Sequence, residues 1–344
     1  MRNGGKIAAL VSALALALAG CGSTADQAGT QGAAEKPTLT LYNAQHEDLM
    51  KVMVDAFTKE SGIKVDIRSG EDPDMAHQIL QEGSASPGDV FVTENSPAMT
   101  LVDGQGGFAK LDQATLEQVD QRYRPATGNW AGFAARSTVL AYNPKMLAAA
   151  RLPASLMDLA APEWKDKVGI APGGADFQAI VSAVLALKGE DATAAWLKGL
   201  KENARAYQGN GAAMRAVNAG EIPAAVIYHY YWYKDRAEAG TNSKNVELHF
   251  FGKQDPGAFV GVSGAAVLKA SRHPAEAQAL VKFLTGEQGQ RVLAQSDAME
   301  YSISAKVPAN PALKPLGELA APDVDISSLN GPEVTELMRQ AGLL

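Results

Sequence analysis

The sequence predicts an α/β fold with parallel-rich sheets flanked by helices. Strand and helix patterns alternate along residues 38–93, an order that favours parallel sheets with right-handed crossovers. The third strand of that series, 89–93, has an apolar centre, as a buried parallel strand does. The chain has 344 residues, and the part beyond its N-terminal segment is long enough for two lobes with separate cores.

The first part of the chain predicts a β-α-β-α-β unit. Residues 38–42 and 63–67 alternate apolar and polar side chains with the period of two that marks a strand. Between them, residues 47–60 place apolar side chains at helical spacing, and Gly62 follows as a stop signal. A short helix around 75–80 then leads to the third strand.

The remainder of the chain continues the mixture of helices and strands without an internal repeat. The predicted strands are 138–142, 169–171, 224–227, 246–251 and 265–269. The predicted helices are 176–187, 194–200, 212–219, 274–284 and 288–296. Because no Gly/Ser-rich linker divides this part, we expect the lobes to be joined by strands that cross between them, with 138–142 as one of these.

The N-terminal segment predicts export and lipidation. Two basic residues and an apolar run over 7–19 suit a signal peptide, and the run is too short to span a membrane. It ends in Leu18-Ala19-Gly20-Cys21, which resembles a bacterial lipobox and holds the only cysteine of the chain. We therefore expect 1–20 to be a lipoprotein signal peptide, Cys21 to carry the lipid, and 21–36 to form a flexible tether. An ordinary signal peptide with a chance cysteine is the alternative.

Composition and motifs argue against two classes of function. The formal charge is −7, and no basic stretch carries interleaved aromatic residues, so we expect no binding to nucleic acid. The five histidines are scattered, without the HExxH spacing of metalloproteases. Neither a Gly-x-Ser-x-Gly elbow nor a Walker-type phosphate loop occurs. We therefore expect a protein that is not an enzyme.

A cluster of tyrosines follows the predicted buried strand 224–227. Four of the nine tyrosines lie within six residues, 228–233. Phenolate oxygens are hard anionic donors that suit a hard cation such as ferric iron. An aromatic hydrophobic cluster is the alternative interpretation. Because adjacent strand residues point to opposite faces, Tyr230 and Tyr231 can share one ion only if the backbone turns near His229.

Two further side chains follow other predicted strands. His46 comes four residues after the first strand, and Glu94 directly follows the third. If these strands and the one before the tyrosines point the same way, an imidazole, a carboxylate and two phenols meet at one crevice. We expect His46, Glu94, Tyr230 and Tyr231 to bind Fe3+ there. The alternatives are a loop or helix-start position for His46, a helix cap for Glu94 and core packing for Tyr230.

Several long stretches, in the same order along the chain, resemble the periplasmic ferric-iron-binding proteins of ABC importers, a transferrin-like group of bacterial solute-binding proteins. These stretches are Leu41-Tyr42-Asn43-Ala44-Gln45-His46, Asp89-Val90-Phe91-Val92-Thr93-Glu94, Tyr230-Tyr231-Trp232-Tyr233, and residues 62–65, 69–70, 196–203, 223–225, 254–258 and 263–271. His46, Glu94 and both tyrosines each stand where the matching motif has an iron ligand.

The resemblance implies a two-lobed periplasmic-binding-protein fold, type II-like, whose hinge strands join the lobes and let them close on the ligand. Lobe 1 would comprise 37–135 and about 262–311, and lobe 2 would comprise 136–261 and about 312–344. The imidazole and the carboxylate would come from lobe 1 and the two phenols from lobe 2. The resemblance also implies a monomer at the outer face of the cytoplasmic membrane or in the periplasm, which delivers Fe3+ to an ABC permease and its ATPase.

A synergistic phosphate or carbonate is also implied, and here the chain departs from the family. Members hold the anion on a small hydroxyl-bearing turn at a helix N-terminus, whereas this chain has Ala171-Pro172-Gly173-Gly174-Ala175-Asp176. Asp176 either caps its own helix or marks a site that completes its coordination without the anion. The positions near the anion or behind the direct ligands are Gly174, Ala175, Asp176, Asn210, Arg136 and Tyr228. A receptor for a small organic solute, such as a polyamine, thiamine or a phosphonate, is the alternative on the same fold.

Overall fold

The computed structural model describes residues 36–344 as one compact unit. The predicted signal peptide, Cys21 and residues 21–35 of the predicted tether lie outside the described residues. Within residues 36–344, no helix is long and apolar enough to pass through a membrane.

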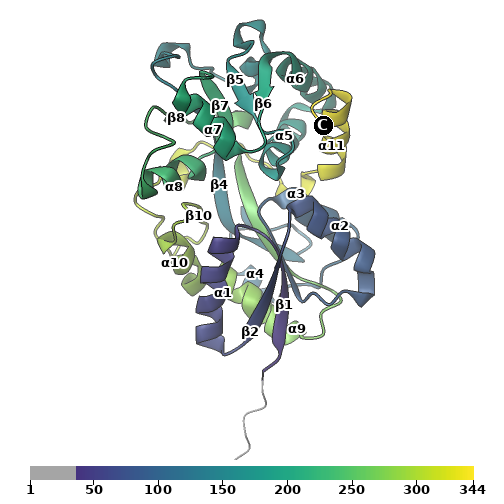
Figure 1. Cartoon of the computed structure of the whole chain (residues 1–344). Helices are drawn as coiled ribbons and strands as arrows, with labels where there is room; N and C mark the ends of the chain where they lie inside the picture. The colour runs from purple at the N-terminus through teal and green to yellow at the C-terminus, as the bar shows by residue number, and fades with distance from the viewer. Residues whose placement is uncertain (1–35) are drawn as a thin grey trace, which may run out of the picture. The chain divides into compact units, whose positions relative to one another are not determined.

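Helices and strands alternate through the described chain, with short 3-10 turns between some of them (Figure 1). The strands are β1 Thr38–Ala44, β2 Lys64–Ser69, β3 Val90–Thr93, β4 Trp130–Tyr142, β5 Val168–Ile170, β6 Ala204–Ala206, β7 Ala224–Tyr228, β8 Glu247–His249, β9 Val260–Val267 and β10 Tyr301–Ser302. The helices are α1 Glu47–Ser61, α2 Asp72–Glu82, α3 Ser96–Gly104, α4 Gln113–Leu116, α5 Ala175–Lys188, α6 Glu190–Asn203, α7 Asn210–Ala219, α8 Tyr230–Glu238, α9 Pro274–Thr285, α10 Glu287–Gln295 and α11 Gly331–Gln340.

The sheet is parallel at its two ends and antiparallel in its middle. Its strands follow the order β2-β1-β3-β9-β4-β7-β5-β6, with β8 and β10 also paired to β4. β1 runs parallel to β2 and β3, and β5 runs parallel to β6 and β7. β9 is antiparallel to both β3 and β4. The middle is antiparallel because β4 leads the chain from one lobe to the other and β9 leads it back, as Figure 1 shows.

β4 connects the two lobes. Between residues 130 and 137 it pairs with β9, and over 138–142 it pairs with β7. We call the half that contains β1–β3 lobe 1 and the half that contains β5–β7 lobe 2. Of β4, the sequence predicts only residues 138–142 as a strand. It also places the start of β9 five residues too late, at 265 rather than 260. Both errors have one cause: these segments are almost entirely buried, so they lack the polar alternation that marks a half-buried strand.

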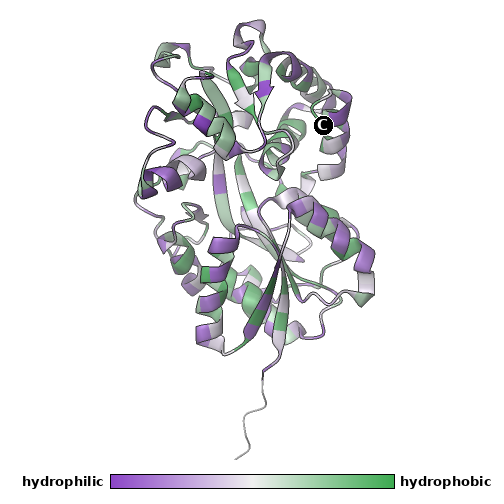
Figure 2. Ribbon diagram, in the orientation of Figure 1, coloured by the Kyte–Doolittle hydropathy of each residue, from purple (hydrophilic) through white to green (hydrophobic). Residues whose placement is uncertain are grey.

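Apolar helix faces cover the sheet. α1 buries one face against it and leaves acidic and basic side chains on the other, as its helical spacing predicts. Gly62 ends the helix with a φ of 70°, a conformation that costs glycine little. Figure 2 shows the hydrophobic residues concentrated on the strands and on such helix faces. The buried residues of α1 are Leu49, Met50, Met53, Val54 and Phe57.

Candidate metal centre

The two adjacent tyrosines lie together because the chain turns directly after β7. His229 has helical dihedral angles, φ −58° and ψ −37°, and α8 begins at Tyr230. The rings of Tyr230 and Tyr231 stack with their centroids 4.3 Å apart. The turn that the sequence requires near His229 is therefore present, and the alternation of a strand does not separate the two phenols.

His229 ties this turn to the crossing strand β4. Its backbone N–H donates to the carbonyl of Ser137 at 3.0 Å, and its ring Nδ1 accepts the N–H of Ser137 at 3.1 Å. The ring is fully buried, and burial lowers its pKa to about 3, so the imidazole is neutral and able to accept. Two hydrogen bonds between His229 and Ser137 thus fix the start of α8 to β4.

Glu94 is positioned by a buried carboxylate in α2. Asp72 accepts the backbone N–H of Glu94 at 2.9 Å and that of Asn95 at 2.8 Å. Burial raises the pKa of Asp72 to about 7, although these two hydrogen bonds act in the opposite direction. Asn95, not Glu94, occupies the position that precedes α3. The side chain of Glu94 is therefore free to face the cleft, and the alternative that it caps α3 is wrong.

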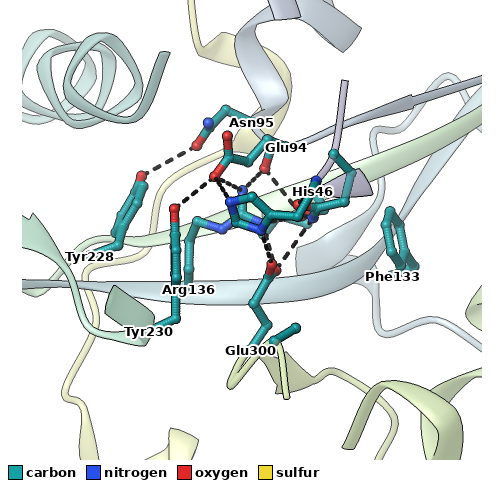
Figure 3. Close-up of polar contacts among 12 residues, drawn as sticks. His46, Glu94, Asn95, Phe133, Arg136, Tyr228, Tyr230 and Glu300 are labelled. Atoms are coloured by element: carbon teal, nitrogen blue, oxygen red, sulfur yellow. Dashed lines mark hydrogen bonds and ion pairs between the residues drawn. The ribbon is translucent and has the colours of Figure 1, made fainter. Parts of the chain in front are cut away.

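The candidate ligands of the two lobes meet at Glu94. The Nε2 atom of His46, which precedes α1, lies 3.3 Å from Glu94 Oε1. The hydroxyl of Tyr230 donates to the same oxygen at 2.9 Å. Figure 3 shows the imidazole and the phenol reaching this carboxylate from different segments. A carboxylate of lobe 1 thus contacts both an imidazole of its own lobe and a phenol of lobe 2.

Asp176 forms the second meeting point. Its Oδ2 atom accepts the hydroxyls of Tyr230 at 3.1 Å and Tyr231 at 3.3 Å, and the side-chain amide of Asn210 at 2.7 Å. Gly174 occupies the cap position of α5, and no side chain caps that helix. The interpretation of Asp176 as a helix cap is therefore wrong. Its carboxylate is 5% exposed and turns toward these donors instead, because a buried charge needs hydrogen-bond partners.

The remaining positions named from the sequence lie around Asp176. Ala175 is the first residue of α5. Asn95 donates to Asp176 Oδ1 at 3.2 Å across the two lobes. The hydroxyl of Tyr228 lies 3.5 Å from the Asn95 oxygen, at the limit of a hydrogen bond. Tyr228 therefore reaches the candidate ligands only through an intermediate side chain.

Arg136 lies in β4 with its side chain fully buried among acidic groups. It forms an ion pair of 2.5 Å with Glu300 and lies 3.9 Å from Glu94 Oε1. It also donates to the backbone carbonyl of Glu94 and to the hydroxyl of Ser263. Arg136 is thus near the candidate site, where the resemblance places it, but it contacts carboxylates that belong to the protein.

Sequence reasoning misses Glu300. The side chain is fully buried, and its Oε1 atom lies 3.3 Å from His46 Nδ1. In the sequence, Glu300 stands out only as an acidic residue directly before the short strand β10. An exposed acidic residue in a loop would look the same. The pairing with Arg136 joins residues far apart in the chain, so no local pattern reveals it.

Without a metal, the phenols hold their protons. Burial, followed by the charge of Asp176, raises the pKa of Tyr230 and of Tyr231 well above 10. Burial and the same charge also raise the pKa of Glu94. Burial lowers the pKa of His46, but its contacts with Glu300 and Glu94 outweigh this effect and raise the pKa above 6.5. A metal that binds here must therefore displace protons.

A metal site at this position depends on the phenols. Among residues 36–344, no group of three or more His, Cys, Asp or Glu side chains could hold a metal ion. The phenol oxygens of Tyr230 and Tyr231 extend the set to an imidazole, two carboxylates and two phenols, which suits a hard ion of high charge. A cavity of about 900 Å³ borders His46 and both tyrosines, so the site has a route of access from solvent.

Comparison with known proteins places the chain in a family. A family model described as bacterial extracellular solute-binding protein matches residues 85–328. The chain is 53% identical to an Fe(3+)-binding periplasmic protein of Serratia marcescens, over 99% of this chain and 98% of that protein. It is 38% identical to the major ferric iron-binding protein of Neisseria meningitidis serogroup B, over 89% of this chain and 93% of that one.

A solved structure agrees in fold. The crystal structure of iron-bound HitA from Pseudomonas aeruginosa is 45% identical and has a TM-score of 0.84, covering 89% of this chain and 99% of HitA. The resemblance drawn from the sequence motifs and the two-lobed fold that it implies are thus confirmed. The chain belongs to the bacterial extracellular solute-binding proteins, a family of transport components rather than enzymes, and within that family to the periplasmic ferric-iron-binding proteins.

Proposed function

We propose that this protein is a lipid-attached receptor that captures Fe3+ outside the cytoplasmic membrane and delivers it to an ABC permease and its ATPase. One observation carries the proposal: an imidazole, two carboxylates and two phenols lie in one continuous set of contacts between the lobes. The Serratia and Neisseria relatives are both described as iron-binding proteins, which supports the choice of ion.

The donors fit the chemistry of a trivalent ion. Fe3+ takes phenolate and carboxylate oxygens, and its charge lowers the phenol pKa so that both tyrosines stay deprotonated at neutral pH. His46 contributes the electron pair of Nε2, and Glu94 contributes its carboxylate. The ion replaces the phenol protons that point at Glu94 and Asp176 in the metal-free contacts.

Asp176 stands in for the synergistic anion. It lies at the start of α5, where the resemblance places the phosphate or carbonate, and it already accepts Tyr230, Tyr231 and Asn210. Two phenolates and two carboxylates exceed the charge of Fe3+ by one, so a further anion would add unfavourable like charge in a partly buried site. We therefore expect iron binding that needs no added phosphate or carbonate.

Opening of the lobes releases the ion. His46 and Glu94 belong to lobe 1, and the tyrosines and Asp176 belong to lobe 2, so a hinge motion divides the donors into two incomplete sets. The lipid on Cys21 and the tether 21–36 keep the receptor near its permease. Replacing Cys21 by Ser should move the protein from the membrane fraction to the soluble fraction, and a variant that stays in the membrane would contradict the lipid attachment.

A titration tests the metal and the anion together. Metal-free protein titrated with ferric citrate should develop a visible phenolate-to-iron band that saturates at one ion per chain, equally with and without phosphate. Absence of the band would overturn iron binding. A band that requires phosphate would leave iron binding intact and overturn the role of Asp176.

Mass spectrometry of the native protein separates the organic-solute alternative. An iron receptor should carry only the mass of the ion, because the protein's own donors bind it. A bound polyamine, thiamine or phosphonate would add a mass that iron does not explain and would favour the alternative.

A further inference from the structure

Each ring nitrogen of His46 faces a different carboxylate. Nε2 lies 3.3 Å from Glu94 Oε1, and Nδ1 lies 3.3 Å from Glu300 Oε1. The ring meets Tyr230 edge-on, with centroids 5.0 Å apart. Nε2 is therefore the nitrogen on the side of the candidate ligands, and Nδ1 is turned away from them (Figure 3).

Glu300 fixes which nitrogen carries a proton. Glu300 pairs with the guanidinium of Arg136 at 2.5 Å through Oε2, and its other oxygen, Oε1, faces Nδ1 of His46. An ionised carboxylate only accepts hydrogen bonds, so Nδ1 must hold the proton that faces it. The electron pair of the neutral imidazole then lies on Nε2, on the metal side.

The segment that carries Glu300 is held firmly. Tyr301 and Ser302 pair with Ala135 and Ala134 of β4, directly before Arg136. Met299, the residue before Glu300, has a φ of 55°, a backbone conformation that residues other than glycine rarely adopt. Such a conformation persists only where the surroundings enforce it, and it occurs often at functional sites. Here the enforced turn brings Glu300 to Arg136 and His46.

An ion pair that only stabilised the fold would not need the imidazole. Glu300 Oε2 is 2.5 Å from Arg136, so one oxygen satisfies the pair, while the other faces His46. Gln45, the residue before His46, also reaches Glu300 Oε2 at 3.4 Å and Ser263 at 2.8 Å. The network thus binds the segment before α1 as well as the ring itself.

We propose that Glu300 is a positioning residue of the metal centre: its carboxylate holds the His46 imidazole with Nε2 directed at the ion. This inference rests on the proposed iron site. Carboxylate partners of metal-binding histidines orient the ring and raise its basicity, and their loss typically weakens metal binding about 10- to 100-fold.

The test compares Glu300→Gln with the parent protein. Because the buried guanidinium of Arg136 needs an acceptor, a glutamine turns its oxygen to Arg136 and presents to His46 only its amide nitrogen, which donates and cannot accept from Nδ1. We expect Fe3+ affinity, measured by competition with a chelator, to fall about 10- to 100-fold, while the phenolate-to-iron band remains. Glu247→Gln is the matched control, because Glu247 accepts from Tyr142 and contacts none of the candidate ligands. It should bind iron as the parent does.

A double-mutant cycle separates positioning from a general structural role. In a His46→Ala background, Glu300→Gln should weaken binding little further, because the group it positions is gone. An equal loss in both backgrounds, or no loss in the first, would overturn the proposal. Glu300→Asp keeps the charge but places the carboxylate one methylene farther from His46, and it replaces the glutamine variant if that one does not fold. It should weaken iron binding only when His46 is present.

A readout without iron makes the two proposals distinguishable. In crystals of the metal-free protein, the His46 ring should leave its present place in Glu300→Gln and keep it in Glu247→Gln. A parent protein that binds no iron would overturn the proposed function, whereas an unmoved ring in Glu300→Gln would overturn the positioning role.

Discussion

On the lobe 1 side of the candidate metal centre, charged groups face one another, and on the lobe 2 side neutral phenols face a single carboxylate. His46, Glu94, Arg136 and Glu300 form ion pairs and backbone contacts before any metal binds. On the other side, both tyrosine hydroxyls donate to Asp176. Lobe 1 therefore supplies donors whose geometry is set in advance by contacts within the protein, while the phenols of lobe 2, whose pKa values are raised well above 10, must lose their protons when the ion arrives.

This difference separates two kinds of effect. A change in lobe 1 alters the direction of a donor and should weaken binding without removing the colour of the phenolate complex. A change in lobe 2 removes negative charge that holds the ion, and it should alter both the affinity for Fe3+ and the colour of the complex. The four predictions below test this contrast, from the largest expected effect to the smallest.

The double change Tyr230→Phe and Tyr231→Phe should abolish the visible band. It should also weaken Fe3+ binding by far more than the ~100-fold typical of residues behind the direct ligands, because both phenolate charges are lost. Visible spectroscopy with a chelator competition measures both. Tyr207→Phe is a suitable control, since Tyr207 is outside this set of contacts. Retained colour and affinity would contradict the assignment of the phenols.

Asp176→Asn should weaken iron binding by about 100-fold or more in phosphate-free buffer, an effect at the upper end of the range for groups around a metal. Because asparagine removes one negative charge, added phosphate or carbonate should restore part of the affinity in this variant and leave the parent unchanged. Asp103→Asn provides the control, because the Asp103 side chain accepts hydrogen bonds from Thr127 and Asn129, away from the candidate ligands. A variant that ignores phosphate would argue against Asp176 as the built-in anion.

Asp72 should stabilise the metal-free protein at pH 5 and lose most of that contribution by pH 8, whereas the lowered pKa of His229 acts in the opposite direction below pH 6.5. The pKa of Asp72 is about 7 in the fold, above its usual 3.8, so the folded state holds a proton that the unfolded state loses. Its stabilising contribution is complete below pH 3.8 and is lost as the pH rises through 7, with a slope of at most ~1.4 kcal/mol per pH unit. The raised pKa of Glu94 acts in the same direction.

Thermal unfolding across this pH range provides the measurement. Asp72→Asn removes the titrating group, so its melting temperature should fall less steeply with pH than that of the parent. Parallel curves for the two proteins would show that Asp72 does not carry this pH dependence. Both proteins are compared metal-free, because Fe3+ stabilises whichever state binds it.

Tyr228→Phe should have the smallest effect. Its hydroxyl makes one long contact of 3.5 Å with Asn95 and none with Glu94 or Asp176. We expect a change of less than about 10-fold in iron affinity, because an ordinary hydrogen bond contributes ~1 kcal/mol and a 10-fold change corresponds to about 1.4 kcal/mol, and we expect an unchanged visible band. A loss comparable to that of the double tyrosine variant would move Tyr228 into the direct ligand set.

Local sequence patterns predict many of the helices, strands and turns of this molecule. They miss the features that depend on contacts between distant segments. The amphipathic helix 47–60, its glycine stop and the turn at His229 follow from spacing and backbone geometry, and the structure confirms them. The first part of β4 was not predicted, because burial on both faces removes the alternation on which strand prediction depends.

The candidate site divides in the same way. His46, Glu94 and the two tyrosines each follow a strand, so the position of each can be predicted from its own neighbourhood. Glu300 meets Arg136 and His46 only through the tertiary fold, and no pattern near residue 300 signals this. The true environment of Asp176 was hidden for the same reason, because its donors come from three separate segments.

The pairing of β4 with β9 decides how the receptor can open. The two strands stay hydrogen-bonded to each other through the crossing region, so sliding one lobe past the other would break their ladder. Torsion of a two-stranded ribbon, in contrast, keeps every rung and spreads a large rotation over small changes at many residues. Arg136 and Ser137 lie on this ribbon, and Ser137 is hydrogen-bonded to His229 at the start of α8, so a change of twist would alter the distance between the two halves of the ion's coordination sphere.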